Sequence, residues 1–246
     1  FFQATQSISQ LSQLLLNSVQ QEMIGLQKIG EKRPLDAHFY VQNQQIAVEN
    51  HRIFAKQPET ILDLFLHLTQ HQTLQVDPMT LRHLRIALQK HQRPLCELPE
   101  ARSRFIQIIQ HPQMVKNAIV PMHQLGVLSA YFPAWQGITG LMQFDMFHIY
   151  TVDEHTVRVM LKLESFLDEQ TKISHPLCYQ IFNACPHKTL VYLSALLHDI
   201  AKGREGDHAE NGAVDMYNFA RLHGFDESQS KQMAWLVKEH LTMSIT

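Results

Sequence analysis

Apolar residues recur at helical spacing along most of this chain. The first set lies near the start and predicts an amphipathic helix: Ile8, Leu11, Leu15, Val19 and Met23. One segment, residues 38–48, instead alternates apolar and polar positions around Asn43-Gln44. This alternation predicts two short strands joined by a tight turn.

Helical patterns follow one another after this hairpin. Asp77 before Pro78 is typical of a helix N-cap. Four prolines stand where a first-turn proline would begin a helix: Pro58, Pro78, Pro99 and Pro112. Three apolar faces are predicted to be buried: Ile61, Leu62, Phe65, Leu66 and Leu68; Leu81, Leu84, Ile86 and Leu88; Phe105, Ile106, Ile108 and Ile109.

A stretch rich in glycine and proline, residues 126–140, predicts a boundary between modules near Gly140. Beyond it the pattern predicts four helices, at about 152–167, 186–198, 208–223 and 228–240. The fold class is therefore mainly α, a helical bundle preceded by a helical linker module with one small β-hairpin. We expect three parts: 1–50 with the first helix and the hairpin, 51–142 as the helical linker, and 143–246 as the bundle.

Composition narrows the function classes. The chain has 246 residues and a formal net charge of -2, which argues against a strongly basic nucleic-acid clamp. Its 3 cysteines are widely spaced and form no CxxC pair, as expected in a reducing compartment. There is no secretory signal and no apolar run near the ~20 residues of a membrane span. These features predict a cytoplasmic protein without a membrane partner, and the start at Phe1-Phe2 predicts a piece of a longer chain.

Sixteen histidines are the unusual feature of the composition. Four of them stand near the ends of the four predicted helices of the bundle: His155, His198, His208 and His240. Most of the others lie outside any recognisable motif and are predicted to be surface or helix-end residues: His38, His51, His67, His71, His83, His91, His111, His123, His175, His187 and His223.

The pair His198-Asp199 ends an almost wholly apolar segment, residues 190–197, which predicts a buried helix. A carboxylate drawn into the interior needs a charge partner, and a metal cation is one such partner. The alternative is a helix end with Asp199 in solvent. Imidazole and carboxylate without thiolate suit Mn, Fe, Zn or Mg in an open site. Lys202 and Arg204 follow closely, and cations there suit a phosphate-bearing substrate.

These residues resemble the HD superfamily of metal-dependent phosphohydrolases. The matching segments are His155-Thr-Val-Arg-Val, Leu197-His-Asp-Ile-Ala-Lys202 and His208-Ala-Glu-Asn-Gly-Ala213. Wider segments, residues 147–156, 196–208 and 235–244, resemble the family of bifunctional uridylyltransferase/uridylyl-removing enzymes of bacterial nitrogen regulation. Residues 54–126 are similar to the part that precedes the HD domain in that family.

The resemblance implies an activity and partners. In that family the HD domain hydrolyses the uridylyl-tyrosine bond on the PII signal protein and releases UMP. A separate nucleotidyltransferase domain adds UMP, and two ACT domains sense glutamine. This sequence has no Gly-Ser followed by an Asp-x-Asp pair, so we expect no transferase activity from it. The hairpin is expected to be the tail of the nucleotidyltransferase domain.

The resemblance also implies roles at the site. His155, His198 and Asp199 would hold one divalent ion. His208 and His240 would hold a second, with Asp199 bridging, although a single ion is the alternative. Asp199 and Lys202 are the catalytic candidates, and His148, Lys202 and Arg204 are the substrate-binding candidates. The HD pattern ends with an Asp on a later helix, and the six residues after His240 contain none.

Two other functions are compatible with the same residues. HD domains also act on free nucleotides, which would be cleaved without PII. A helical regulatory module with inert HD residues would bind no metal and catalyse nothing.

Overall fold

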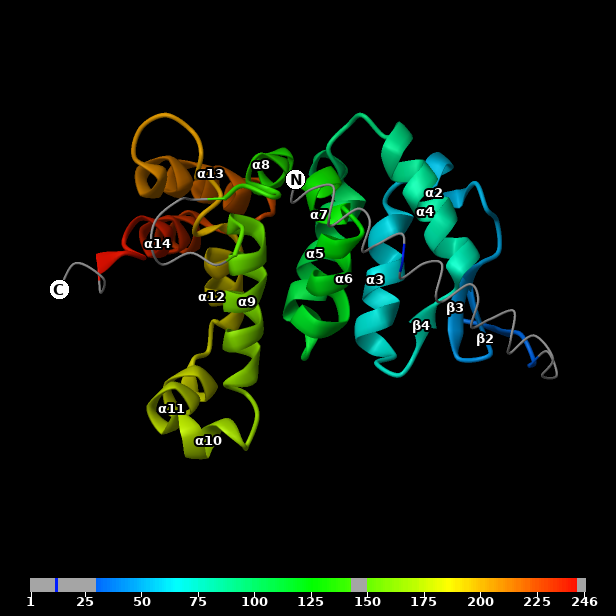
Figure 1. Ribbon diagram of the computed structural model, residues 1–246, viewed down its shortest axis with the longest axis horizontal. Coiled ribbons are helices and arrows are strands. Elements are labelled where there is room, and N and C mark those ends of the chain that lie inside the picture. The colour runs from blue at the N-terminus through cyan, green and yellow to red at the C-terminus, as the bar shows by residue number, and fades with distance from the viewer. Residues whose placement is uncertain (1–11, 13–29, 143–149, 243–246) are drawn as a thin grey trace.

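The computed structural model describes residues 12, 30–142 and 150–242. These residues are mainly helical, with one small sheet at one end, and the predicted fold class is confirmed (Figure 1). The helix predicted from Ile8 to Met23 lies outside the described residues, and so does His148. Among the described residues, no helix combines the length and the apolar character that a membrane span requires.

The sheet has the strand order β1-β2-β3-β4. Its strands are short: β1 (Arg33–Pro34), β2 (Phe39–Gln42), β3 (Gln45–Val48) and β4 (Gln75–Val76). The predicted hairpin is β2–β3, and its turn residues Asn43 and Gln44 have φ values of 50° and 61°, as a two-residue turn of this kind requires. Strands β1 and β4 were not predicted, because two residues carry no alternation.

The helices that follow the hairpin pack on the sheet and on one another (Figure 1). Their bounds are α2 (Ile53–Lys56), α3 (Thr60–Gln70), α4 (Pro78–Lys90), the 3-10 helix η1 (Leu95–Glu97), α5 (Pro99–Gln110), the π-helix η2 (Val115–Ile119), α6 (Val120–Gln124), α7 (Val127–Tyr131) and α8 (Pro133–Ile138). Pro78 and Pro99 begin helices as predicted, and the Asp77 carboxylate accepts the Thr80 N–H at 2.8 Å. Pro58 and Pro112 instead lie before the first turns of α3 and η2.

Burial largely follows the predicted apolar faces, although Leu66, Leu81, Leu88 and Ile106 are only half-buried. Ile61, Leu62 and Phe65 of α3 are fully buried. The prediction for Ile86 of α4 was wrong, since this side chain is 42% exposed. Helix α4 packs against α2 and β3 on one side only, so the stripe around Leu84 is buried and Ile86 faces away from it.

The second half of the chain forms the bundle. Its helices are α9 (Val152–Ser165), α10 (Thr171–Ser174), α11 (Pro176–Ala184), α12 (Lys188–Leu197), α13 (His208–Leu222) and α14 (Glu227–Lys238). Helices α9, α12, α13 and α14 lie where the sequence predicted them. Helices α10 and α11 were missed, and they lie at the lower end of α9 (Figure 1).

Both halves contribute side chains to one hydrophobic core. The ring of Phe105 in α5 stacks on Tyr131 in α7 at 4.3 Å, and its edge meets Phe219 in α13 at 6.1 Å. The stretch near Gly140 therefore separates two groups of helices that share buried contacts. The division into three parts remains a prediction.

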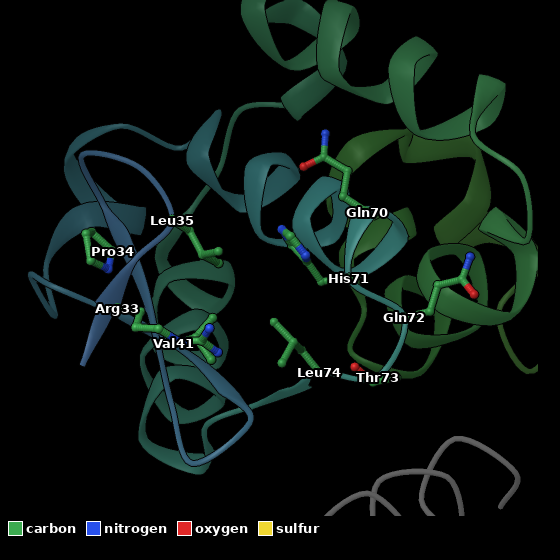
Figure 2. Close-up of a pocket in the computed structure, with 9 residues that line it drawn as sticks. All are labelled: Arg33, Pro34, Leu35, Val41, Gln70, His71, Gln72, Thr73 and Leu74. Atoms are coloured by element: carbon green, nitrogen blue, oxygen red, sulfur yellow. The ribbon is translucent and has the colours of Figure 1, made fainter. Parts of the chain in front are cut away.

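A pocket of about 640 Å³ lies between the sheet and the end of α3. Figure 2 shows residues that line it. Arg33, Val41 and His71 are among the residues that line it. None of the residues predicted to bind metal or substrate does, so this pocket is separate from the predicted site.

Candidate metal centre

Four helix ends bring the five predicted metal ligands together. His155 lies in the first turn of α9, and His198 follows the last turn of α12. His208 begins α13, whose start is fixed by the Asp207 carboxylate accepting the N–H groups of Ala209 and Glu210. His240 follows the end of α14. Helices α9, α13 and α14 all contact α12, so their ends meet around Asp199, the residue after His198.

The two oxygens of Asp199 face two different groups of histidines. Oδ2 lies 3.2 Å from Nε2 of His198 and 3.9 Å from Nε2 of His155. Oδ1 lies 3.5 Å from Nε2 of His240 and 3.9 Å from Nε2 of His208. Each group could hold a metal ion by the spacing of its ligand atoms, and Asp199, only 2% exposed, belongs to both.

Two of the four histidine rings are oriented by backbone carbonyls. Nδ1 of His198 lies 2.8 Å from the Ala195 carbonyl, and Nδ1 of His240 lies 2.6 Å from the Val237 carbonyl. A carbonyl only accepts, so each Nδ1 carries a hydrogen and Nε2 is the ring nitrogen that faces Asp199. Such backbone bonds are the usual support of ligating histidines.

Several polar atoms of this cluster have no hydrogen-bond partner in the part of the chain that the structure describes. Oδ1 of Asp199 and the Nε2 atoms of His208 and His240 are buried without a hydrogen bond among the described residues. A lone pair that faces a carboxylate is repelled unless a cation, either a proton or a metal ion, lies between them. The donor set and its orphaned atoms therefore fit a divalent cation.

The pKa shifts follow from burial and mutual proximity. Burial alone would raise the pKa of Asp199, but His198, His240 and Lys202 hold it below its usual range. The Asp199 carboxylate raises the pKa of His240. Burial lowers the pKa of His208. Asp199 is thus ionised at neutral pH, as a metal ligand must be.

The three remaining predicted site residues have different surroundings. Nζ of Lys202 lies 3.0 Å from Oδ2 of Asp199, and its side chain is 9% exposed. Arg204 pairs with Asp215 of α13 at 2.5 Å and is 46% exposed. Its role in substrate binding stays a prediction, as does that of His148, which lies outside the described residues.

Sequence reasoning missed a buried pair behind this cluster. His123, predicted to be a surface or helix-end residue, lies in the last turn of α6, but its side chain is only 5% exposed and its Nε2 lies 3.8 Å from Oδ2 of Asp153. Asp153 is 1% exposed and lies two residues before His155. The apolar neighbours Val120 and Met122 were a weak signal of burial. No sequence signal linked His123 to a residue 30 positions later.

Comparison with known proteins gives one family-model match in each half of the chain. Residues 39–131 match the uridylyltransferase GlnD third domain, a range that includes the hairpin β2–β3. Residues 152–246 match the HD domain.

Relatives match along the whole chain. It is 50% identical over 246 residues to the bifunctional uridylyltransferase/uridylyl-removing enzyme of Haemophilus influenzae (strain PittEE). It is 49% identical to the enzyme of that name from Pasteurella multocida (strain Pm70), and 40% identical to that from Vibrio cholerae. In each case the match covers 100% of this chain and 28% of the relative's length. Along its whole length the chain is therefore similar to the part of these bifunctional enzymes that spans about a quarter of their length, and its two halves match the models of the third domain and the HD domain.

Proposed function

We propose that this chain removes UMP from uridylylated PII signal protein by metal-dependent hydrolysis of the phosphodiester. The observation that carries the proposal is Asp199, which presents one carboxylate oxygen to each of two histidine groups in a buried setting. The HD-domain match supports hydrolysis, and the name of the relatives supports a uridylyl group as the group removed.

The ligands divide between two groups. His155, His198 and Asp199 would hold one divalent ion, and Asp199, His208 and His240 would hold a second. When bound, a divalent cation supplies Lewis-acid chemistry, since it makes water a stronger nucleophile at neutral pH and neutralises charge on a phosphoryl group. The backbone carbonyls of Ala195 and Val237 keep two of the imidazoles oriented for this role.

The contact of Lys202 with Asp199 supports a role for Lys202 in stabilising negative charge. Its ammonium group lies beside Asp199 and is almost buried, so it adds a fixed positive charge at the edge of the site. Such a charge stabilises the negative charge that develops on a phosphoryl group during hydrolysis. The leaving group in this reaction is a tyrosine phenol with a pKa near ~10, which needs little help from an acid.

The proposal also covers the accompanying domains, the cellular location and the partner of this chain. The relatives are several times longer than this chain, so we infer that a nucleotidyltransferase domain and ACT domains accompany it in one polypeptide. We place the protein in the cytoplasm, with uridylylated PII as its partner. We propose that the chain divides into three parts: residues 1–50 with the hairpin, residues 51–142 as the helical linker and residues 143–246 as the HD bundle.

The double variant His198→Ala/Asp199→Ala tests the function. We expect it to lower UMP release from uridylylated PII by at least about a hundredfold, because the loss of metal ligands costs more than the loss of their supports. Metal analysis should find divalent ions in the wild-type chain and little in the variant. Helical circular dichroism should be retained.

A matched control is His187→Ala with Asp168→Ala, a His and an Asp that are both exposed in the same half of the chain. This pair should keep full activity and metal content. UMP release that persists in the His198/Asp199 variant would show that the site is wrongly assigned. Cleavage of free nucleotides with no action on uridylylated PII would favour a nucleotide hydrolase, and a wild-type chain without metal or activity would favour an inert module.

A further inference from the structure

A second buried polar contact lies behind the metal cluster, on the opposite side of α9. His123 of α6 and Asp153 of α9 come within 3.8 Å, with side chains 5% and 1% exposed. Nδ1 of His123 and Oδ1 of Asp153 have no hydrogen-bond partner among the described residues. The ring of Trp135 in α8 meets the His123 ring edge-on at 6.0 Å. Burying an imidazole and a carboxylate lowers the stability of the fold, so a functional role would explain why this pair is buried.

The contact joins the two family segments of the chain. His123 lies within residues 39–131, and Asp153 lies within residues 152–246. Successive residues on a helix are rotated by 100°, so Asp153 and His155 point to nearly opposite faces of α9. Asp153 faces the third domain while His155 faces Asp199.

A second contact holds the other end of α9 to the same helical stretch. The Glu164 carboxylate accepts the N–H of Val115 at 2.7 Å and that of Lys116 at 3.1 Å. These are the first residues of η2, which continues into α6, so Glu164 acts as a cap from the neighbouring segment. Asp153 and Glu164 thus fix α9 near both ends of its length.

The distance of 3.8 Å between Nε2 of His123 and Oδ2 of Asp153 is longer than a hydrogen bond, so the protonation of the ring decides how the two groups interact. Burial lowers the pKa of His123, so the ring is neutral at neutral pH. A carboxylate only accepts hydrogens, which favours the tautomer with hydrogen on Nε2, the atom that faces Asp153. Glu154 also comes within 4.0 Å of this nitrogen but is turned to Arg158 at 2.9 Å.

We propose that His123 is a positioning residue: by holding Asp153 it fixes the rotation of α9, and with it the place of His155 in the metal centre. The third domain is then part of the support of the HD site. This inference rests on the metal centre of the proposed function. Supports of metal ligands typically contribute about 10- to 100-fold to metal affinity.

The test is titration of the metal-free 246-residue chain with Mn²⁺, followed by electron paramagnetic resonance of the free ion. His123→Phe keeps a ring against Trp135 and removes the nitrogens, and we expect it to weaken Mn²⁺ binding by about tenfold or more. His123→Gln restores an N–H donor and should recover most of the affinity. If His123→Phe does not fold, His123→Leu takes its place.

Tyr131→Phe is the control, because Tyr131 and His223 also form a buried hydrogen bond between the two segments but lie off α9. It should lower the free energy of unfolding in urea and leave Mn²⁺ affinity unchanged. If a folded His123→Phe or His123→Leu chain binds Mn²⁺ as tightly as wild type, this inference is overturned and the metal centre is not. A wild-type chain that binds no Mn²⁺ would overturn the metal centre and this inference with it.

Discussion

Tyr131 and His223 show how one buried pair depends on its protonation. Nε2 of His223 lies 2.5 Å from the Tyr131 hydroxyl, and Nδ1 lies 2.7 Å from the Phe219 carbonyl. Nδ1–H donates a hydrogen bond to the carbonyl, so Nε2 accepts a hydrogen bond from the Tyr131 hydroxyl, whose pKa is raised by burial. This arrangement requires a neutral imidazole, and burial lowers the pKa of His223 to about 4.

The stability of the chain should therefore depend on pH through His223. The unfolded chain binds a proton here at pH 6.5 and the folded chain only near pH 4, so stability is lost as the pH falls through this window. The loss reaches about 3 kcal/mol when both states are protonated. Urea unfolding between pH 7 and pH 4 should show a shallower decline for His223→Gln than for wild type.

The exposed His187 provides the comparison for this pH effect. His187→Gln should follow the wild-type curve. Equal pH dependence in wild type and His223→Gln would mean that folding does not lower the pKa of His223.

At the scale of elements, the metal centre depends on how closely α13 approaches its neighbours. A Cβ built on Gly212 would lie 3.1 Å from Cγ1 of Val237 in α14 and 3.6 Å from the His198 carbonyl. A glycine here lets α13 pack closely enough to place His208 beside His240, with ring centroids 5.6 Å apart. The helix periodicity of the sequence gave no indication of this close approach.

Gly212→Val should separate these helices. We expect overpacking to lower the free energy of unfolding by about 1–3 kcal/mol and to weaken metal binding at the group of Asp199, His208 and His240. Gly137→Val in α8 is the matched control, since a Cβ there meets nothing within 4 Å. Urea unfolding and Mn²⁺ titration of both variants would measure the difference, and equal stability of the two would contradict this account of the packing.

At the scale of the whole molecule, the two halves share buried contacts that cross the stretch near Gly140. The ring of Phe132 meets Phe219 of α13 at 5.3 Å, and α9 packs against η2 and α8. Two halves that share one core are expected to unfold together.

The two tryptophans make this testable, because one lies in each half. In the variant Trp235→Phe, the buried Trp135 alone reports on the first half, while far-ultraviolet circular dichroism follows all helices. We expect both signals to change at the same urea concentration. A circular dichroism transition in two steps, with fluorescence following only one of them, would show that the halves unfold independently.

The sequence by itself determined the mainly helical class, the hairpin around Asn43-Gln44 and the five residues that meet at the centre. These depend on local periodicity, turn chemistry and a recognisable order of His and Asp along the chain. Tertiary structure decided the rest. The division of the histidines into two groups around Asp199 was already implied by the resemblance, but only packing shows the distances in each group, the pairing of Arg204 with Asp215 and the burial of His123. The physical reason is that such contacts join side chains far apart in sequence, where no local pattern records the partner.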